Sequence, residues 1–557
     1  MTWFYWPYLD GTVLGVLVFV AWFAPRLGDA WFAKIEKAGA RFAGRKSLAV
    51  FAILILTIVL RVSLLGVMPV EPPGIHDEFS YLLAGDTFAH GRLANPPHAM
   101  AVFFDTFHVL QQPTYASIYF PAQGVVLALG QLLGQAWIGV LLSMAAMCAA
   151  MLWMSQGWLP ARWALLGAIL VLVRFGIVSY WINGYWGGAV PALGGALVMG
   201  ALPRILRRQH PRHALLLGLG AAVLATSRPF EGLVLCLPVA AVFCVWLAGK
   251  RSPPLRVTLP RVVLPVAAVL FFTAAFTLYY DWRVTTDPFL FPYTLNLRTH
   301  EIMEPFVWEK SGAVLRHANP QFDAFYEKYQ FHGGWAELRR ASWEKLAGFY
   351  DFFLGPALLA PFAAAWRVLF DRRMRFLGVQ CLFCFAGMFA AVWYFPHYSA
   401  PLMATFFCIL LQSLRHLRRW KFRGQPVGIG LTRAVFLSVL ITLPVCLAQV
   451  IRDPTGYHGL NRPGNWKRAR MLEQLAVMPG DQLVVVRYSA DKHNVDEEWV
   501  YNDADIDHAK VVWAREIPGL DMRPLLEYFR GRHVWLAEPD LAVPRLSPYS
   551  GTSQLSP

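Results

Sequence analysis

Two adjacent carboxylates, Asp77 and Glu78, open a polar stretch directly beyond a long apolar segment. We therefore expect them near the headgroup level of a membrane, where a low local dielectric raises the proton affinity of a carboxylate and suits it to general-base chemistry. The same residues also fit a solvated acidic loop, or the start of a helix, whose dipole favours acidic side chains. From the residues alone, the functional and the structural interpretation have equal weight.

Polar residues also stand at three turns between apolar segments. Arg228 and Glu231 lie within one turn of each other. The planar guanidinium of Arg228 is suited to an anionic headgroup or a phosphate, and an internal ion pair with Glu231 is an equally good interpretation. His397 and Tyr398 occupy a second turn, where such residues more often anchor a helix at the membrane interface. Asn183 lies in a third, very tight turn.

Membrane-spanning helices are the elements that must position these residues. Of the 557 residues, 56% are hydrophobic and only 15% are charged, and the mean hydropathy is +0.42. In soluble proteins about a quarter of all residues are charged. We predict a mainly α, polytopic membrane protein with about twelve spans of roughly 20 apolar residues or somewhat fewer. The predicted spans are Tyr8–Ala24, Leu48–Met68, Ala136–Ser155, Trp163–Ile182, Gly188–Leu202, Ala214–Thr226, Phe230–Ala248, Val262–Tyr280, Tyr350–Trp366, Phe376–Phe395, Tyr398–Leu414 and Ala434–Val450.

Positive charge decides how the predicted spans are oriented. The formal net charge is +15, but the basic residues gather in short connectors and form no stripe on a soluble face that would bind nucleic acid. They fill alternate connectors, above all 26–46, 204–212, 250–261, 367–375 and 415–433. The positive-inside rule assigns these connectors to the cytoplasm. We therefore expect a multi-pass protein of the cytoplasmic (inner) membrane with both termini extracytoplasmic.

The pattern divides the chain into three parts. Residues 1–47 form an extra N-terminal span and a basic loop. Residues 48–450 form the main transmembrane part, which carries two long outer loops, 69–135 and 281–349. Residues 451–557 form a soluble domain on the outer face.

The C-terminal part alternates between predicted strands and helices. Strands are predicted at 481–488, 509–513 and 533–536, and helices at 466–477 and 522–529. This alternation is typical of a small α/β unit with a parallel sheet. An accessory role, gripping an acceptor or covering the membrane site, is our preferred interpretation.

Short motifs follow one another along the transmembrane part in an informative order. They are His76-Asp77-Glu78-Phe79-Ser80-Tyr81, Gly91-Arg92-Leu93, Tyr119-Phe120-Pro121-Ala122-Gln123-Gly124, Thr226-Ser227-Arg228-Pro229-Phe230-Glu231-Gly232 and His397-Tyr398-Ser399-Ala400-Pro401. Together they resemble the C-type fold of membrane glycosyltransferases that use polyprenyl-phosphate sugars, whose best-known members are the protein O-mannosyltransferases and the lipid A aminoarabinose transferases. The resemblance covers roughly residues 48–414.

The resemblance implies an inverting transfer of a sugar from a polyprenyl-phosphate donor to a glycan, lipid or protein acceptor at the outer face of the membrane. Asp77 would be the general base and Glu78 would orient the sugar or the acceptor. The donor phosphate would be bound by Arg228, with His397 and Tyr398 behind it. Further substrate contacts are expected from His76, Tyr81, Asn183 and Glu231. No cofactor is implied.

The chain departs from this family at the turn that contains Asn183, where many relatives carry a second acidic residue. No metal site is therefore predicted, and weight shifts onto Asp77 and Glu78. Two other functions fit the sequence less well. A transporter or flippase for a lipid-linked glycan would show internal repeats and polar residues along a path through the membrane, and a non-catalytic scaffold would not need so many spans.

Overall fold

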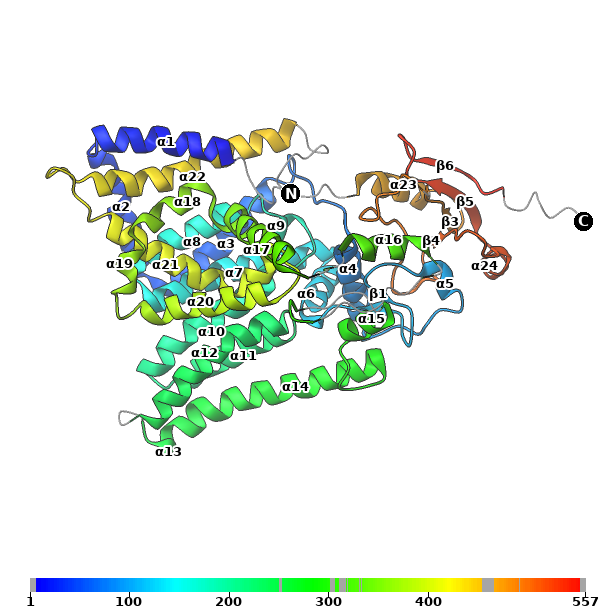
Figure 1. The fold of residues 1–557 in the computed structure, drawn as a ribbon, viewed down its shortest axis with the longest axis horizontal. Coiled ribbons are helices and arrows are strands. Elements are labelled where there is room, and N and C mark those ends of the chain that lie inside the picture. The colour runs from blue at the N-terminus through cyan, green and yellow to red at the C-terminus, as the bar shows by residue number, and fades with distance from the viewer. Residues whose placement is uncertain are drawn as a thin grey trace, which may run out of the picture.

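The structure is a computed structural model that describes residues 7–249, 253–300, 306–309, 317, 319–329, 331, 333–452, 465–489 and 491–550. The described chain is mainly helical and ends in a small sheet (Figure 1). The predicted fold class, a polytopic helical protein with a C-terminal α/β unit, is confirmed. Residues 301–305 and 310–316 of the second predicted loop lie outside the described residues.

The transmembrane part is a bundle of apolar helices. Among the described residues, eight helical segments are long and apolar enough to cross a membrane: Lys46–Ser63, Ala136–Trp158, Ala189–Arg207, Pro229–Ala248, Leu255–Thr285, Trp335–Ala364, Pro396–Leu417 and Val427–Ala448. The shorter apolar helices Tyr8–Phe23, Pro211–Ala225 and Arg375–Ala390 accompany them. The described residues thus contain eight long and three shorter apolar helical segments, and the predicted count of about twelve spans is not confirmed.

The helices of the bundle are α1 (Pro7–Phe23), α2 (Asp29–Gly44), α3 (Lys46–Ser63), α7 (Ala136–Trp158), α8 (Ala161–Phe175), α9 (Tyr180–Asn183), α10 (Ala189–Arg207), α11 (Pro211–Ala225), α12 (Pro229–Ala248), α13 (Leu255–Thr258), η1 (Leu259–Val263), α14 (Leu264–Thr285), α17 (Trp335–Phe349), η2 (Tyr350–Leu354), α18 (Gly355–Leu359), η3 (Ala360–Ala364), α19 (Trp366–Leu369), α20 (Arg375–Ala390), η4 (Pro396–Leu402), α21 (Met403–Leu417) and α22 (Val427–Arg452).

The clearest differences between predicted spans and observed helices are at the fourth and the ninth span. The fourth ends early, because α8 stops at Phe175 and the chain turns irregularly before the short α9. The ninth is broken into π-helical, α-helical and 3₁₀ turns after α17. Gly355 has a φ of 61° there, and Pro356 and Pro361 lack the backbone N–H that a regular helix needs.

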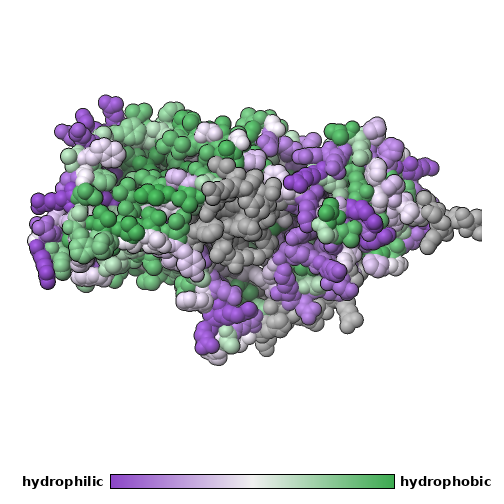
Figure 2. All heavy atoms as spheres, turned by 90° about the horizontal axis from the view of Figure 1, so that it is seen from above, coloured by the Kyte–Doolittle hydropathy of each residue, from purple (hydrophilic) through white to green (hydrophobic). Residues whose placement is uncertain are grey.

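The two ends of the bundle differ in charge. The α/β unit (residues 465–550) lies at one end, which we call the domain end, and α2, α13 and α19 lie at the other (Figure 1). These three helices border the Lys- and Arg-rich connectors. Hydrophobic residues cover the bundle between hydrophilic residues at its far end and the hydrophilic α/β unit (Figure 2). The predicted segregation of positive charge to one end is therefore seen, and the molecule is a multi-pass membrane protein.

The segment after α3 folds into a compact layer at the domain end. It contains α4 (His76–Ala89), α5 (Ala101–Phe104), the antiparallel pair β1 (Val109–Leu110) and β2 (Ala116–Ser117), and α6 (Pro121–Leu132). Helix α6 packs against α4 and α7. A Cβ on Gly124 would lie 2.7 Å from the Cβ of Ala84 in α4, so a side chain larger than hydrogen would push the helices apart. This contact holds α4 against the end of the bundle.

The C-terminal sheet has the order β4-β3-β5-β6. Strands β3 (Gln482–Val486), β4 (Val511–Arg515) and β5 (His533–Glu538) are parallel, with Val484 opposite Trp513 and Trp535. The helices α23 (Trp466–Ala476) and α24 (Arg523–Tyr528) were predicted with these strands and are confirmed. The antiparallel edge strand β6 (Arg545–Pro548) was not predicted. It is short and contains no fully buried residue. Its sequence lacks the apolar run that marks a strand.

The α/β unit shares a hydrophobic core with the layer around α4. Phe79, Leu83 and Phe104 of that layer pack with Tyr501 and Ile506. The backbone N–H of Ala504 donates to Asp86 in α4 at 2.7 Å. The unit is therefore fixed to α4 by both apolar and polar contacts. The predicted domain boundary at 450 falls within α22, and residues 453–464 lie outside the described residues.

Candidate active site

Asp77 lies in the first turn of α4, where the helix dipole stabilises a carboxylate. Its side chain is 25% exposed, so it is reachable from outside the protein. One oxygen accepts a very short hydrogen bond from the Tyr119 hydroxyl. The Nδ1 atom of His108 lies 3.1 Å from that hydroxyl and 3.8 Å from the other Asp77 oxygen. The carboxylate is thus held in one orientation by a phenol and an imidazole.

Glu78, the next residue of the same turn, contacts the chain before α4 and the turn after α9. Its Oε2 accepts from the Gly74 N–H at 2.8 Å, and its Oε1 accepts from the Tyr185 N–H at 2.8 Å. Burial raises the pKa of Glu78 to about 7, although the backbone donors oppose the shift. Both oxygens are engaged by backbone groups, so Glu78 fastens the start of α4 to the turn after α9.

A basic and aromatic cluster lies beside Asp77. The Tyr81 ring stacks on Tyr119 with centroids 4.3 Å apart, and the Arg228 guanidinium lies over the Tyr398 ring at 4.1 Å. Burial raises the pKa of Tyr81, whose hydroxyl is also within electrostatic range of Arg228 and Asp77. The fold therefore brings helices that are distant in sequence to one polar cluster.

Two further residues complete this cluster. Glu231 interacts electrostatically with both Tyr81 and Arg228. Tyr293, in α15 (Pro292–His300), is within electrostatic range of Tyr398, Arg228 and Asp77. No ion pair forms between Arg228 and any carboxylate of the described residues, Glu231 included. The internal ion pair that the sequence left open is therefore not made, and the guanidinium keeps its capacity for an anion.

An apolar groove runs from this cluster between α12, α20 and η4. Its lining residues are Phe230, Glu231, Val234, Cys384, Phe385, Gly387, Met388, Ala391, Trp393, Tyr394, Tyr398, Ser399, Pro401 and Leu402. Only a few polar groups, among them Glu231 and Tyr398, interrupt its apolar wall. The indole N–H of Trp393 is buried there without a hydrogen-bond partner in the described part of the chain. A groove of this composition suits a hydrocarbon chain with a polar head at one end.

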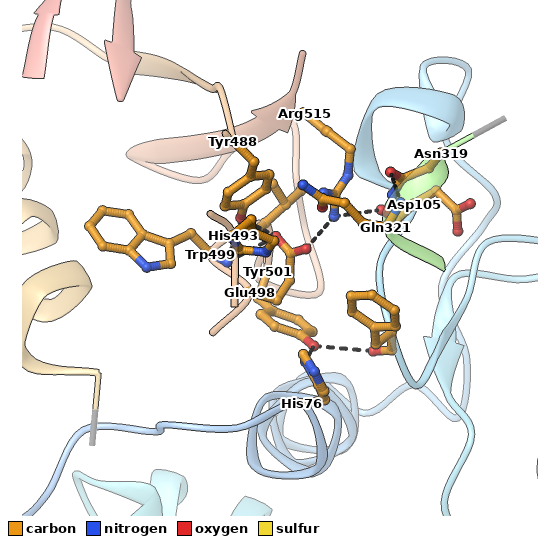
Figure 3. A network of polar contacts seen from close by, with 12 residues as sticks. His76, Asp105, Asn319, Gln321, Tyr488, His493, Glu498, Trp499, Tyr501 and Arg515 are labelled. Carbon is orange, nitrogen blue, oxygen red and sulfur yellow. Dashed lines mark hydrogen bonds and ion pairs between the residues drawn. The ribbon is translucent and has the colours of Figure 1, made fainter. Parts of the chain in front are cut away.

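His76, Asn183 and His397 form hydrogen bonds with other parts of the protein. The His76 Nδ1 is 2.8 Å from the Tyr501 hydroxyl of the α/β unit (Figure 3), and burial lowers the pKa of His76 to about 3. Asn183 accepts from the Arg61 guanidinium at 3.0 Å and donates to two backbone carbonyls. His397 is 2.9 Å from the Tyr180 hydroxyl. These contacts are internal, so we expect supporting roles from the three residues.

Three members of the cluster were missed by sequence reasoning. Tyr119 stands in a motif that was recognised, but no feature of the sequence pairs it with Asp77. His108 lies in an irregular stretch with a φ of 61°, a conformation that sequence patterns do not reveal for histidine. Tyr293 belongs to the second outer loop, whose approach to Arg228 depends on the tertiary fold.

A second polar network joins the α/β unit to this layer (Figure 3). Arg515 forms a fully buried ion pair with Glu498 and hydrogen bonds to Gln321 in α16 (Pro320–Tyr329). Glu498 also accepts from the Tyr488 hydroxyl. Burial alone would raise the pKa of Glu498, but Arg515 and Tyr488 lower it to about 2. The two opposite charges of this network are therefore paired with each other inside the protein.

The fold and the cluster define a multi-pass membrane protein with a polar site where the bundle meets its α/β unit. In the described residues, no group of three or more His, Cys, Asp or Glu side chains is arranged to hold a metal ion. The site is therefore built from a carboxylate, an arginine and aromatic hydroxyls next to an apolar groove.

Comparisons with known proteins find similar solved structures only. No family model matches the sequence, and no curated protein does. The chain is similar to ArnT from Cupriavidus metallidurans in the apo state, with 13% identity, a TM-score of 0.49 and coverage of 89% of this chain and 93% of that one. The same protein bound to undecaprenyl phosphate gives 13% identity, a TM-score of 0.48 and the same coverage.

Two larger proteins are also similar to the chain. An oligosaccharyltransferase from Archaeoglobus fulgidus, tethered to an acceptor peptide, has 10% identity and a TM-score of 0.40, with 80% of this chain and 62% of that chain covered. The arabinofuranosyltransferase AftD from Mycobacteria has 14% identity and a TM-score of 0.34, with 88% and 35% covered. These are proteins of the kind that the sequence resemblance named.

Proposed function

We propose that this protein is a glycosyltransferase that moves a sugar from a polyprenyl-phosphate donor to the hydroxyl of an acceptor. The observation that carries the proposal is the meeting of three features at the domain end. A partly exposed carboxylate with fixed orientation, an arginine that makes no ion pair with the described carboxylates and an apolar groove all lie in one cluster. This combination suits a substrate that is part hydrocarbon, part phosphate and part sugar.

Arg228 would bind the donor phosphate while the hydrocarbon tail occupies the groove. A guanidinium pairs with phosphate oxygens through parallel hydrogen bonds. As the bond from the sugar to the phosphate breaks, negative charge grows on the leaving oxygen, and a cation held beside it stabilises that charge. The Tyr398 ring fixes the guanidinium from one face. A lipid phosphate leaves as an anion, so no second acid is needed.

Asp77 would act as the general base. It would take the proton of the acceptor hydroxyl while that oxygen attacks the anomeric carbon, and the phosphate would leave on the opposite side. One displacement of this kind inverts the configuration of the sugar. The Tyr119 hydrogen bond keeps one carboxylate oxygen occupied, which leaves the other to face the acceptor.

The reaction would occur at the outer face of the cytoplasmic membrane. The basic connectors gather at the end opposite the α/β unit, and the positive-inside rule would place that end in the cytoplasm. The domain end, with both termini, would then face outward. Sugars, acceptors and the α/β unit would meet there.

The first test is a transfer assay with the full chain in lipid nanodiscs. Labelled polyprenyl-phosphate sugars are supplied with an envelope extract as the source of acceptor, and the released lipid phosphate is measured. We expect wild-type protein to consume at least one donor, and we expect a deletion strain to lack one envelope glycan modification. If no donor is consumed while vesicles show movement of a lipid-linked glycan across the membrane, a transporter is the correct function.

A further inference from the structure

His108 is held in an unusual backbone conformation next to Asp77. Its φ of 61° lies in the left-handed region, which side chains other than glycine adopt rarely and at an energetic cost. The conformation is fixed from α4, because the Ser80 hydroxyl donates to the His108 carbonyl at 2.6 Å and lies 2.7 Å from the Ser117 hydroxyl. Ser80 lies one turn after Asp77 on the same helix. A single helix thus carries the carboxylate and fixes the imidazole beside it.

Tyr119 stands between the carboxylate and the imidazole. Its hydroxyl donates to Asp77 and lies 3.1 Å from the His108 Nδ1. In the tautomer with its proton on Nε2, His108 offers Nδ1 as a second acceptor for the same phenol proton. The three groups form a continuous path for a proton, which leads away from Asp77.

We propose that His108 receives, through Tyr119, the proton that Asp77 removes from the acceptor, and releases it to water. This inference rests on the proposed function. The acceptor O–H bond breaks and its proton moves to Asp77, while the lipid phosphate leaves with the electron pair of the sugar–oxygen bond. The protonated carboxyl then turns its O–H toward the Tyr119 oxygen and gives up that proton as Tyr119 gives its own to the His108 Nδ1. The imidazolium loses its Nε2 proton to solvent, and exchange with water then moves the remaining proton from Nδ1 back to Nε2, which returns all three groups to their starting states.

The surroundings of His108 favour release of a proton from the imidazolium. Burial lowers the pKa of His108, although the charge of Asp77 opposes the shift. The His76 ring lies 5.7 Å from the His108 ring, and His300 is within electrostatic range of His108; neither adds negative charge. The side chain of His108 keeps 17% of its surface exposed, so solvent is within reach. Burial and Asp77 raise the pKa of Tyr119 well above its usual value, so the phenol keeps its proton between transfers.

Two substitutions separate proton transfer from simple positioning. Asparagine tolerates the left-handed conformation, and His108→Asn retains an amide that can hydrogen bond Tyr119 but cannot carry a proton onward. His108→Gly removes the imidazole, relieves the backbone and leaves room for imidazole from solution. We expect both variants to express as the wild type does and to transfer sugar about 100-fold more slowly, the lower end of the effect of acid–base groups. We expect added imidazole to restore His108→Gly severalfold and to leave His108→Asn unchanged.

The matched control is His90→Gln, since His90 is an exposed histidine at the end of α4. We expect its transfer rate to equal that of the wild type with and without imidazole. Wild type and Asp77→Asn are measured in parallel. An active wild type, an inactive Asp77→Asn and a fully active His108→Asn would overturn the relay alone. A wild type that consumes no donor would overturn the proposed function, and the relay with it.

Discussion

Two arginines at the domain end, one buried and one half-buried, show opposite uses of the same side chain. Arg515 is paired with Glu498, whose other contacts come from Tyr488 and from the backbone N–H groups of residues 499 and 500. Arg228 lies over an aromatic ring and makes no ion pair with the described carboxylates. A buried charge needs a partner. We infer that the first arginine has its partner within the fold and that the second receives one from the substrate.

The first turn of α4 repeats this difference between two adjacent carboxylates. Glu78 is occupied by two backbone donors, whereas Asp77 accepts from one phenol and remains partly exposed. The comparison shows that residue type alone does not mark a functional group. What distinguishes Asp77 and Arg228 is that each keeps bonding capacity on a surface that a substrate can reach.

The largest effect on stability is expected when the buried ion pair of Arg515 and Glu498 is broken. Glu498→Gln leaves Arg515 charged and buried without an anion, and breaking such a pair costs about 3–5 kcal/mol of unfolding free energy. We expect the α/β unit to become sensitive to protease and the melting transition in detergent to fall steeply. Glu527→Gln, at an exposed position of α24, is the control and should leave both unchanged. A normal melting curve for Glu498→Gln would contradict the inference that Arg515 needs Glu498 as its partner within the fold.

Replacing Arg228 in the cluster beside Asp77 should slow sugar transfer and leave the fold intact. Arg228→Met is expected to slow transfer by about 10²–10³-fold, as the loss of one donor to a developing anion does. Its unfolding free energy should change by only about 1 kcal/mol, the size of a lost cation–π contact.

Polyprenyl phosphate provides the measurement for this variant. A ligand that binds only the folded state raises the melting temperature, so the lipid phosphate should stabilise the wild type and should not stabilise Arg228→Met. Arg208→Met, at an exposed site beyond α10, should respond as the wild type does. If Arg228→Met unfolds as readily as Glu498→Gln, the two arginines do not differ in the way we infer.

A smaller effect concerns the pH dependence of stability. The pKa of Glu78 is raised from 4.5 to about 7 in the folded protein, so the folded state binds more protons than the unfolded chain in this range. The stability from this group is therefore present below pH 4.5 and is lost as the pH rises through about 7. Melting curves across this range should show a decline that is weaker in Glu78→Gln.

The glutamine variant should also start from a lower stability, since one backbone N–H loses its acceptor. Part of the slope should remain, because burial also raises the pKa of Glu71 to about 8. Glu473→Gln, at an exposed position of α23, should keep the full slope. An unchanged slope in Glu78→Gln would show that this carboxylate does not titrate differently on folding.

Much of the fold was readable from the sequence because it depends on local patterns. Apolar runs predicted the helices, and alternating strands and helices predicted the parallel sheet of the α/β unit. The breaks after α8 and α17 were missed, since a run of apolar residues does not show where glycine and proline interrupt a helix within it.

The site was readable only in part. Asp77, Tyr81, Arg228, Glu231 and Tyr398 were expected and lie in one cluster. His76, Asn183 and His397 were also expected at the site, and each makes a hydrogen bond within the protein. The sequence shows which residues lie near the end of a span, but the direction of each side chain depends on partners from other elements. Tyr119 and His108 were missed for the same reason.

The central claim is that Asp77 removes the acceptor proton beside a phosphate held by Arg228. The most direct measurement is the single-turnover rate of sugar transfer by Asp77→Asn in nanodiscs, with binding of polyprenyl phosphate measured on the same sample. We predict a rate about 10²–10⁴-fold below that of the wild type, with lipid-phosphate binding retained. Transfer at the wild-type rate would contradict the account.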